Sequence, residues 1–372
     1  MQALSAAAPL AVGAFPGQPV RTIHVAGIDA LRIICAVWVV LSHAGGLPIA
    51  DFLARLGTSV PIVKFVASVN AVAFDGVAAV MVFYVVSGLC IHLPVTSMNQ
   101  LDPVKFWIRR VFRVGAPLIV AIVLSKVLMG RSSMLAPVLW SLYSELIYYA
   151  IYPALLRVAS TVGWRLVFAG SVFTSALTVI LVPNKDGFVW GYGISLTWLY
   201  GLPVWILGVL LAEVIPAGAP ALSRIQLTGL RLAVWLASSL ATALHFHSSL
   251  RYSLSMLLFS PLAFYWVLQE IRAARERGTS KILETCGQAS YSVYLCHMIV
   301  LAGFSLSPRI RIGQFLEAWL ACAAFCTGFY LCIESPSHSL ARALAGRIPA
   351  RLWMRKMPDI IAHKTNAVVS AK

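Results

Sequence analysis

IDALRIICAVWVVLSH, residues 28–43, places polar side chains inside an apolar segment. Eleven steps of about 100° return Arg32 and His43 to nearly one helix face, roughly 16 Å apart along the axis. Asp29 precedes Arg32 by three residues, so we expect an ion pair at the helix start. A cation and an imidazole buried in hydrocarbon usually mark a functional pathway. The alternatives are that Arg32 extends to the interface and that His43 bonds a neighbouring helix.

The composition is that of a membrane protein. Of 372 residues, 60% are apolar and only 11% are charged, about half the charged share of a soluble domain. Long apolar runs recur through the chain and predict an all-α, polytopic transmembrane helix bundle. We expect about ten spans, at 28–48, 71–93, 114–129, 137–156, 166–182, 191–212, 230–245, 252–270, 288–304 and 314–333.

The net charge of +16 is distributed unevenly along the chain. Most lysines and arginines fall on one side of the predicted spans, which makes that side, with the N-terminus and the C-terminus, cytoplasmic. Such a bias suits the anionic inner leaflet, which makes nucleic acid the weaker interpretation. We expect a disordered cytoplasmic tail at 1–26, a transmembrane domain at 27–336 and a basic cytoplasmic tail at 337–372.

The first twenty residues lack a basic segment, so a cleaved signal peptide is not expected. The seven cysteines all fall in or beside apolar spans, and no histidine or carboxylate accompanies them at metal-ligand spacing. We interpret them as packing residues and predict no disulfide and no metal site.

A basic cluster precedes the third predicted span in FWIRRVFRVGAP, residues 106–117. Arg109, Arg110 and Arg113 carry guanidinium groups that can bind phosphate bidentately. A helix N-terminus at the start of that span would add a favourable dipole. The alternative is an ordinary positive-inside cluster in the linker 94–113.

An acidic residue lies inside the fourth predicted span, in LWSLYSELIYY, residues 139–149. Helical spacing puts Ser141 and Tyr148 on the same side as Glu145. A carboxylate in the membrane is paired or neutral. A structural salt bridge to Arg32 or Arg131 is therefore the alternative to a catalytic role.

Two further segments carry polar residues on apolar helices. In GQASYSVYLCHMIV, residues 287–300, a stripe of Ser290, Tyr294 and His297 either bonds neighbouring helices or lines a substrate tunnel. In FYVVSG, residues 83–88, Ser87 and Gly88 are small enough for close helix packing.

Taken in order, these segments resemble membrane acyltransferase family 3, the bacterial integral-membrane O-acyltransferases of surface carbohydrates. The resemblance runs from residue 28 to about residue 336. It rests on the arginine and histidine of the first span and on five further motifs, at Phe83, Tyr84, Ser87 and Gly88; Arg109, Arg110, Arg113 and Pro117; Trp140, Ser141, Leu142, Glu145 and Tyr148; Ser290, Tyr291, Tyr294, Leu295 and His297; and Ile333, Glu334 and Pro336. The chain departs from the usual pattern at Ala79, Ile147 and Ile299 and in the spacing of Pro117.

The resemblance implies an enzyme of the bacterial inner membrane. It would move an acyl group, most commonly acetyl, from cytoplasmic acyl-CoA to a hydroxyl of a carbohydrate or glycolipid acceptor, with no permanently bound cofactor. It implies catalytic roles for His43 as general base, Arg32 and Glu145, and donor binding by the arginine cluster. A transient acyl-histidine and direct transfer both remain open. The residues expected to line the substrate site are Ser87, Ser141, Tyr148, Tyr294 and His297. A flippase or exporter of a glycan or lipid-linked sugar is the competing interpretation, because it also places charged residues in mid-membrane.

Overall fold

The computed structural model describes residues 25–98, 101–130, 135–184, 187–215, 219–248, 250–304 and 312–349, and all regular elements in those ranges are helices. This agrees with the predicted all-α class. The helices are α1 (Ile28–His43), α2 (Ile49–Arg55), α3 (Val60–Ala73), α4 (Gly76–Met98), α5 (Pro103–Arg110), α6 (Ala116–Met129), α7 (Ala136–Val162), α8 (Trp164–Leu181), α9 (Gly193–Val214), α10 (Arg224–His247), α11 (Tyr252–Arg277), α12 (Lys281–Gly287), α13 (Ser290–Gly303), α14 (Ile312–Phe329) and α15 (Ser335–Arg347).

Seven helical segments in the described ranges are long and apolar enough to cross a membrane. The chain is therefore a multi-pass membrane protein. The segments are Val60–Thr96, Pro103–Met129, Trp164–Leu181, Val189–Val214, Arg224–His247, Tyr252–Arg277 and Gly313–Arg347.

Two of the predicted spans form short helices. With 16 and 14 residues, α1 and α13 measure about 24 Å and 21 Å at 1.5 Å per residue. Both are shorter than the ~30 Å hydrocarbon core of a bilayer. The count of ten spans and the cytoplasmic placement of the termini therefore stay predictions. The expected tails lie mostly outside the described residues, and α15 continues to Arg347, past the predicted boundary at residue 336.

The basic linker predicted at 94–113 is largely helical. The helix α5 passes through a π-helical turn, η1 (Val111–Gly115), directly into α6. The expectation of a free helix N-terminus beside the arginines is therefore wrong, because the amide groups there belong to a continuing helix. A second π-helical turn, η4 (Tyr330–Glu334), joins α14 to α15 in the same way.

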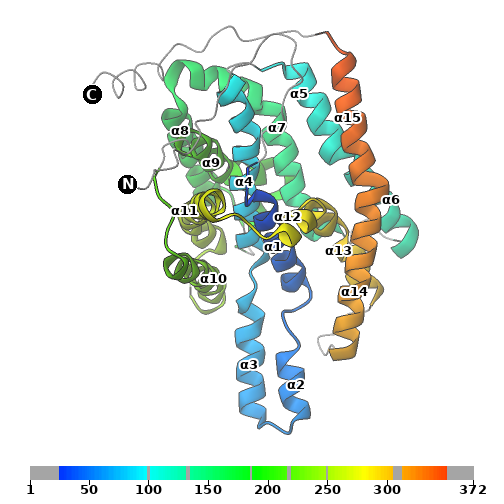
Figure 1. The fold of residues 1–372 in the computed structure, drawn as a ribbon. Coiled ribbons are helices and arrows are strands. Elements are labelled where there is room, and N and C mark those ends of the chain that lie inside the picture. The colour runs from blue at the N-terminus through cyan, green and yellow to red at the C-terminus, as the bar shows by residue number, and fades with distance from the viewer. Residues whose placement is uncertain are drawn as a thin grey trace, which may run out of the picture.

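The helix α1 lies inside the bundle, where it packs against α4, α12 and α13 (Figure 1). Beyond its C-terminal end, α2 and α3 lie side by side and project past the other helices (Figure 1). At the side of the bundle, α14, η4 and α15 form one long helical column. We call the end of α1 that carries Arg32 the arginine end and the opposite one the histidine end.

The pair α4 and α9 packs closely at two glycines. An added Cβ at Gly88 would lie 2.0 Å from the carbonyl oxygen of Trp205, and one at Gly208 would lie 2.0 Å from that of Val85. Because both obstacles are backbone atoms, neither can be relieved by a side-chain rotation. This close approach fixes the position of Ser87, the residue beside Gly88. The packing role expected for Gly88 is confirmed.

We expect Gly208→Ala to force α4 and α9 apart and to destabilise the protein by about 1–3 kcal/mol, as overpacking usually does. The measurement is the thermal unfolding midpoint of the detergent-solubilised protein. Gly170→Ala in α8 is the matched control, because a Cβ there meets nothing within 4 Å. Equal midpoints for the two variants would contradict the packing argument.

Candidate active site

Two histidines from distant parts of the chain meet at the histidine end. His43, the last residue of α1, has its Nδ1 atom 3.0 Å from Nε2 of His297 on α13. The ring centroids are 5.1 Å apart. His297 is completely buried, whereas His43 is only partly buried. The polar stripe predicted on residues 287–300 therefore does bond a neighbouring helix, and the neighbour is the helix that carries His43.

The hydrogen-bond partners assign the protons of this pair. His297 Nδ1 lies 3.0 Å from the carbonyl oxygen of Val293, which can only accept, so Nδ1 carries the proton. In the neutral ring Nε2 is then the acceptor, and it takes the Nδ1 proton of His43. The carbonyl of Val39, 3.1 Å from His43 Nδ1, agrees with a proton on that atom. The lone pair of His43 therefore lies on Nε2, which is free to accept a proton.

A second polar layer surrounds Glu145 in α7. Its Oε1 atom accepts hydrogen bonds from Ser87 Oγ on α4, at 2.6 Å, and from the hydroxyl of Tyr149. The indole of Trp205 on α9 donates to the same serine at 3.3 Å. Three helices thus meet at this carboxylate. The salt bridge considered as an alternative for Glu145 is not formed with Arg32, whose ion-pair partner is Asp29 at 3.7 Å.

The tyrosines of α7 make different contacts. Tyr148 lies near Glu145, as the spacing predicts, and its hydroxyl donates to the carbonyl of Trp198 on α9, at 2.9 Å. The ring of His43 is contacted by His297 from α13. Sequence analysis missed Tyr149, although its position one turn after Glu145 was a usable signal.

Ser141 and Tyr294 lie between these layers. Their hydroxyl oxygens are 2.5 Å apart, and the ring of Tyr294 lies 6.3 Å from that of His297. The hydroxyl of Tyr84 also donates to the carbonyl of Ser141. The predicted lining residues Ser87, Ser141 and Tyr294 therefore face the interior shared by α1, α4, α7 and α13.

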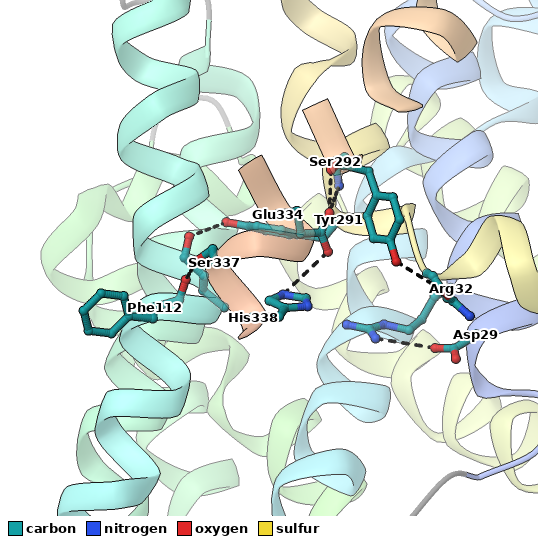
Figure 2. Close-up of polar contacts among 11 residues, drawn as sticks. Asp29, Arg32, Phe112, Tyr291, Ser292, Glu334, Ser337 and His338 are labelled. Atoms are coloured by element: carbon teal, nitrogen blue, oxygen red, sulfur yellow. Dashed lines mark hydrogen bonds and ion pairs between the residues drawn. The ribbon is translucent and has the colours of Figure 1, made fainter. Parts of the chain in front are cut away.

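Three guanidinium groups converge at the arginine end. The charges of Arg32 and Arg110 both act on Arg113, so the first helix and the basic cluster lie close together. Figure 2 shows Arg32 and its ion pair with Asp29 in this region. Arg109 is exposed on α5. The predicted cluster is thus divided, with Arg110 and Arg113 facing the interior and Arg109 more open to the surroundings.

A small cavity lies beside Arg110 and Tyr149. The guanidinium of Arg110 lies 5.7 Å from the ring centroid of Tyr149, whose hydroxyl bonds Glu145. The Nε atom of Arg110 is buried and has no hydrogen-bond partner in the described structure. The cavity has a volume of about 200 Å³ and is lined by Trp107, Arg110, Val111, Leu146, Tyr149 and Ala150.

A larger cavity of about 550 Å³ lies between α6, α13 and α14 and has an apolar lining. Neither cavity is lined by His43. Within the described ranges no group of three or more His, Cys, Asp or Glu side chains is arranged to hold a metal ion. The arrangement offers an anion site at one end, a free imidazole nitrogen at the other, and a hydroxyl-rich layer between them.

Comparison with known protein families identifies the family of the chain. No curated protein and no solved structure matches the chain. The family model described as an acyltransferase domain, that of acyltransferase family 3, matches residues 25–334. This range includes all the motifs quoted above apart from Pro336. The chain therefore belongs to acyltransferase family 3 and is a membrane acyltransferase.

Proposed function

We propose that this protein transfers an acyl group, most commonly acetyl, from cytoplasmic acyl-CoA to a hydroxyl of a carbohydrate or glycolipid in a bacterial inner membrane. The observation that carries the proposal is the imidazole pair, in which His297 holds His43 with its Nε2 lone pair free. A base of this kind is required to activate a hydroxyl nucleophile near neutral pH.

The arginine end suits the donor. Acyl-CoA carries phosphate groups, and guanidinium groups bind phosphate through charge-assisted hydrogen bonds. Arg32, Arg110 and Arg113 lie close together, and the unpartnered Nε of Arg110 is a donor without an acceptor. Buried polar atoms are normally satisfied, so an anionic ligand is the natural partner for this atom.

The cavity beside Arg110 gives the slender pantetheine arm a first place to enter. It leads from the guanidinium to Tyr149, and hence to the layer of Glu145 and Ser87. Neither of these two cavities is lined by His43, so the thioester advances beyond them to reach the imidazole.

The reaction then follows from the proton assignment. His43 Nε2 takes the proton of the acceptor hydroxyl while the hydroxyl oxygen attacks the thioester carbonyl. The tetrahedral intermediate expels the CoA thiolate, which recovers the proton from His43, so one ester bond forms and one thioester bond breaks. The Nδ1 proton stays directed at His297 throughout, which stabilises the imidazolium as it forms.

Arg32 does not stabilise the oxyanion in this scheme. It lies about 16 Å along the helix from His43, whereas an oxyanion donor must lie within about 3 Å of the developing charge. Arg32 instead orients the donor at the arginine end. The hydroxyls of Ser141 and Tyr294, close to His297, are placed to contact the acceptor or the thioester.

Replacing His43 by alanine removes the base, so we expect transfer to fall by about 10²–10⁴-fold. The assay measures CoA release from acetyl-CoA by membranes, with the glycan fraction of a strain lacking this gene as acceptor. Mass analysis of the surface glycans of strains with and without the gene identifies the product. Wild-type rates in a normally expressed His43→Ala variant would refute the assignment, and glycan movement without CoA release would favour an exporter.

For His297, the informative comparison is between glutamine and leucine. His297→Gln retains an acceptor from α13 for the Nδ1 proton of His43, whereas His297→Leu leaves that proton only the carbonyl of Val39. We expect kcat of the leucine variant to fall by up to about 10²-fold, which is part of the 10²–10⁴-fold that a positioned base contributes. The kcat of the glutamine variant should fall less. Similar losses in both variants, at unchanged thermal stability, would show that the hydrogen bond has no role.

Arg113→Ala is expected to raise the KM for acetyl-CoA by about 10–10²-fold, the range for loss of one hydrogen bond to a charged group. Arg113→Lys should recover part of this loss, because it keeps the charge but not the forked geometry. Arg224→Ala removes the same charge from the exposed start of α10 and serves as the control. An unchanged KM in Arg113→Ala would leave the arginine cluster with only a role in setting the orientation of the chain in the membrane.

A further inference from the structure

The turn that carries Arg113 has an unusual backbone. The segment η1 is π-helical, with hydrogen bonds that close wider rings than those of the flanking α5 and α6. Such turns are rare, and they occur frequently at functional sites. A turn of this kind changes the rotation of the helix, so it sets the direction of Arg113 relative to Arg110.

Two side chains from other helices donate to carbonyls of this turn. Ser337 on α15 donates to the carbonyl of Phe112, and Tyr291 on α13 donates to that of Val114 at 2.8 Å. Figure 2 shows these side chains gathered around the turn. Side-chain partners therefore satisfy carbonyls that the widened turn presents.

Glu334 links the helices that supply those partners. It is the last residue of the second π-helical turn, η4, and is almost completely buried. Its Oε2 atom accepts from the amide of Ser292 at 3.1 Å and from the hydroxyl of Ser292 at 2.5 Å. Its Oε1 atom lies 3.8 Å from Nε2 of His338 (Figure 2). Glu334, which directly precedes α15, thus joins the start of that helix to α13.

We propose that Tyr291, Ser337 and Glu334 form a clamp that holds η1 in its π-helical form and so positions Arg113 for the donor phosphates. This inference rests on the proposed function. Its members are positioning residues, since they act through the backbone of the turn. The charge of Glu334 also acts on Arg113 and Arg32, which keeps these cations compatible with their buried surroundings until an anionic donor binds.

The test uses Tyr291→Phe, Ser337→Ala and the double variant in the full chain. Each change removes one hydroxyl donor from the clamp with little change in volume. We expect each single variant to weaken CoA affinity and raise the KM for acetyl-CoA by about three- to ten-fold, the range for one neutral hydrogen bond. The double variant should show a larger effect, and kcat should stay within about two-fold of wild type.

Two controls separate positioning from general destabilisation. Tyr330→Phe removes a hydroxyl from η4 that bonds Gln288 outside the clamp, so CoA affinity should not change. Ser337→Thr retains the hydroxyl and should restore wild-type affinity. Thermal midpoints measured on the same samples report any loss of folding.

CoA binding, measured by calorimetry on the purified protein, needs no turnover. If wild type binds CoA and the double variant binds it equally well, the clamp is wrong while the proposed function stands. If CoA binds in a clamp-dependent way but no acyl group is transferred, the proposed function fails and the clamp stands. A fall in kcat at unchanged KM and CoA affinity would also overturn the clamp.

Discussion

The hydrogen bond between His43 and His297 is the contact on which the rest of the site depends. A histidine inside a helix bundle has two neutral forms, and only the form with its lone pair on Nε2 leaves that atom free to act as a base. His297 selects this form because its own Nδ1 proton is held by Val293. A buried imidazole thus does for His43 what a carboxylate often does elsewhere, without placing a negative charge next to it.

The arginine end differs from the histidine end because it concentrates charged groups. Arg32, Arg110 and Arg113 bring like charges together among buried surroundings, and desolvated cations are stable only with partners. Asp29 pairs with Arg32, and Glu334 acts on Arg32 and Arg113. The charges of Arg32 and Arg110 still oppose that of Arg113, so the cluster keeps repulsion between like charges. A site with residual positive charge is one that an anionic ligand stabilises.

Spacing within single helices predicted a good part of this site. The pair of Asp29 and Arg32 followed from their separation of three residues, and the apolar runs predicted an all-helical membrane protein. Contacts between helices could not be derived in this way. Nothing local indicated that Ser87 would bind Glu145, or that the stripe ending at His297 would face His43, because periodicity gives the face of a helix but not the neighbour that covers it.

The errors have the same origin. Tyr148 and Tyr149 both lie within one turn of Glu145, and only the position of α9 decides which of them turns toward it. The π-helical turn η1 left no recognisable pattern, because two of its carbonyls accept hydrogen bonds from residues more than 170 positions away. The sequence therefore predicted a break before α6 where the structure has a continuous helix.

The shortness of α1 and α13 bears on how one site could receive both the donor and the acceptor of the proposed reaction. Both helices are too short to cover the hydrocarbon core alone, and both lie among longer helices that shield them from lipid. His43 is therefore at the end of its helix, where the chain turns toward α2 and α3, while Arg32 lies near the opposite end (Figure 1). Under the proposed function, the charged head of the donor would stay with the arginines while its slender arm covers the distance. An acceptor approaching from the side of α2 and α3 would then reach the imidazole without passing the proposed phosphate site.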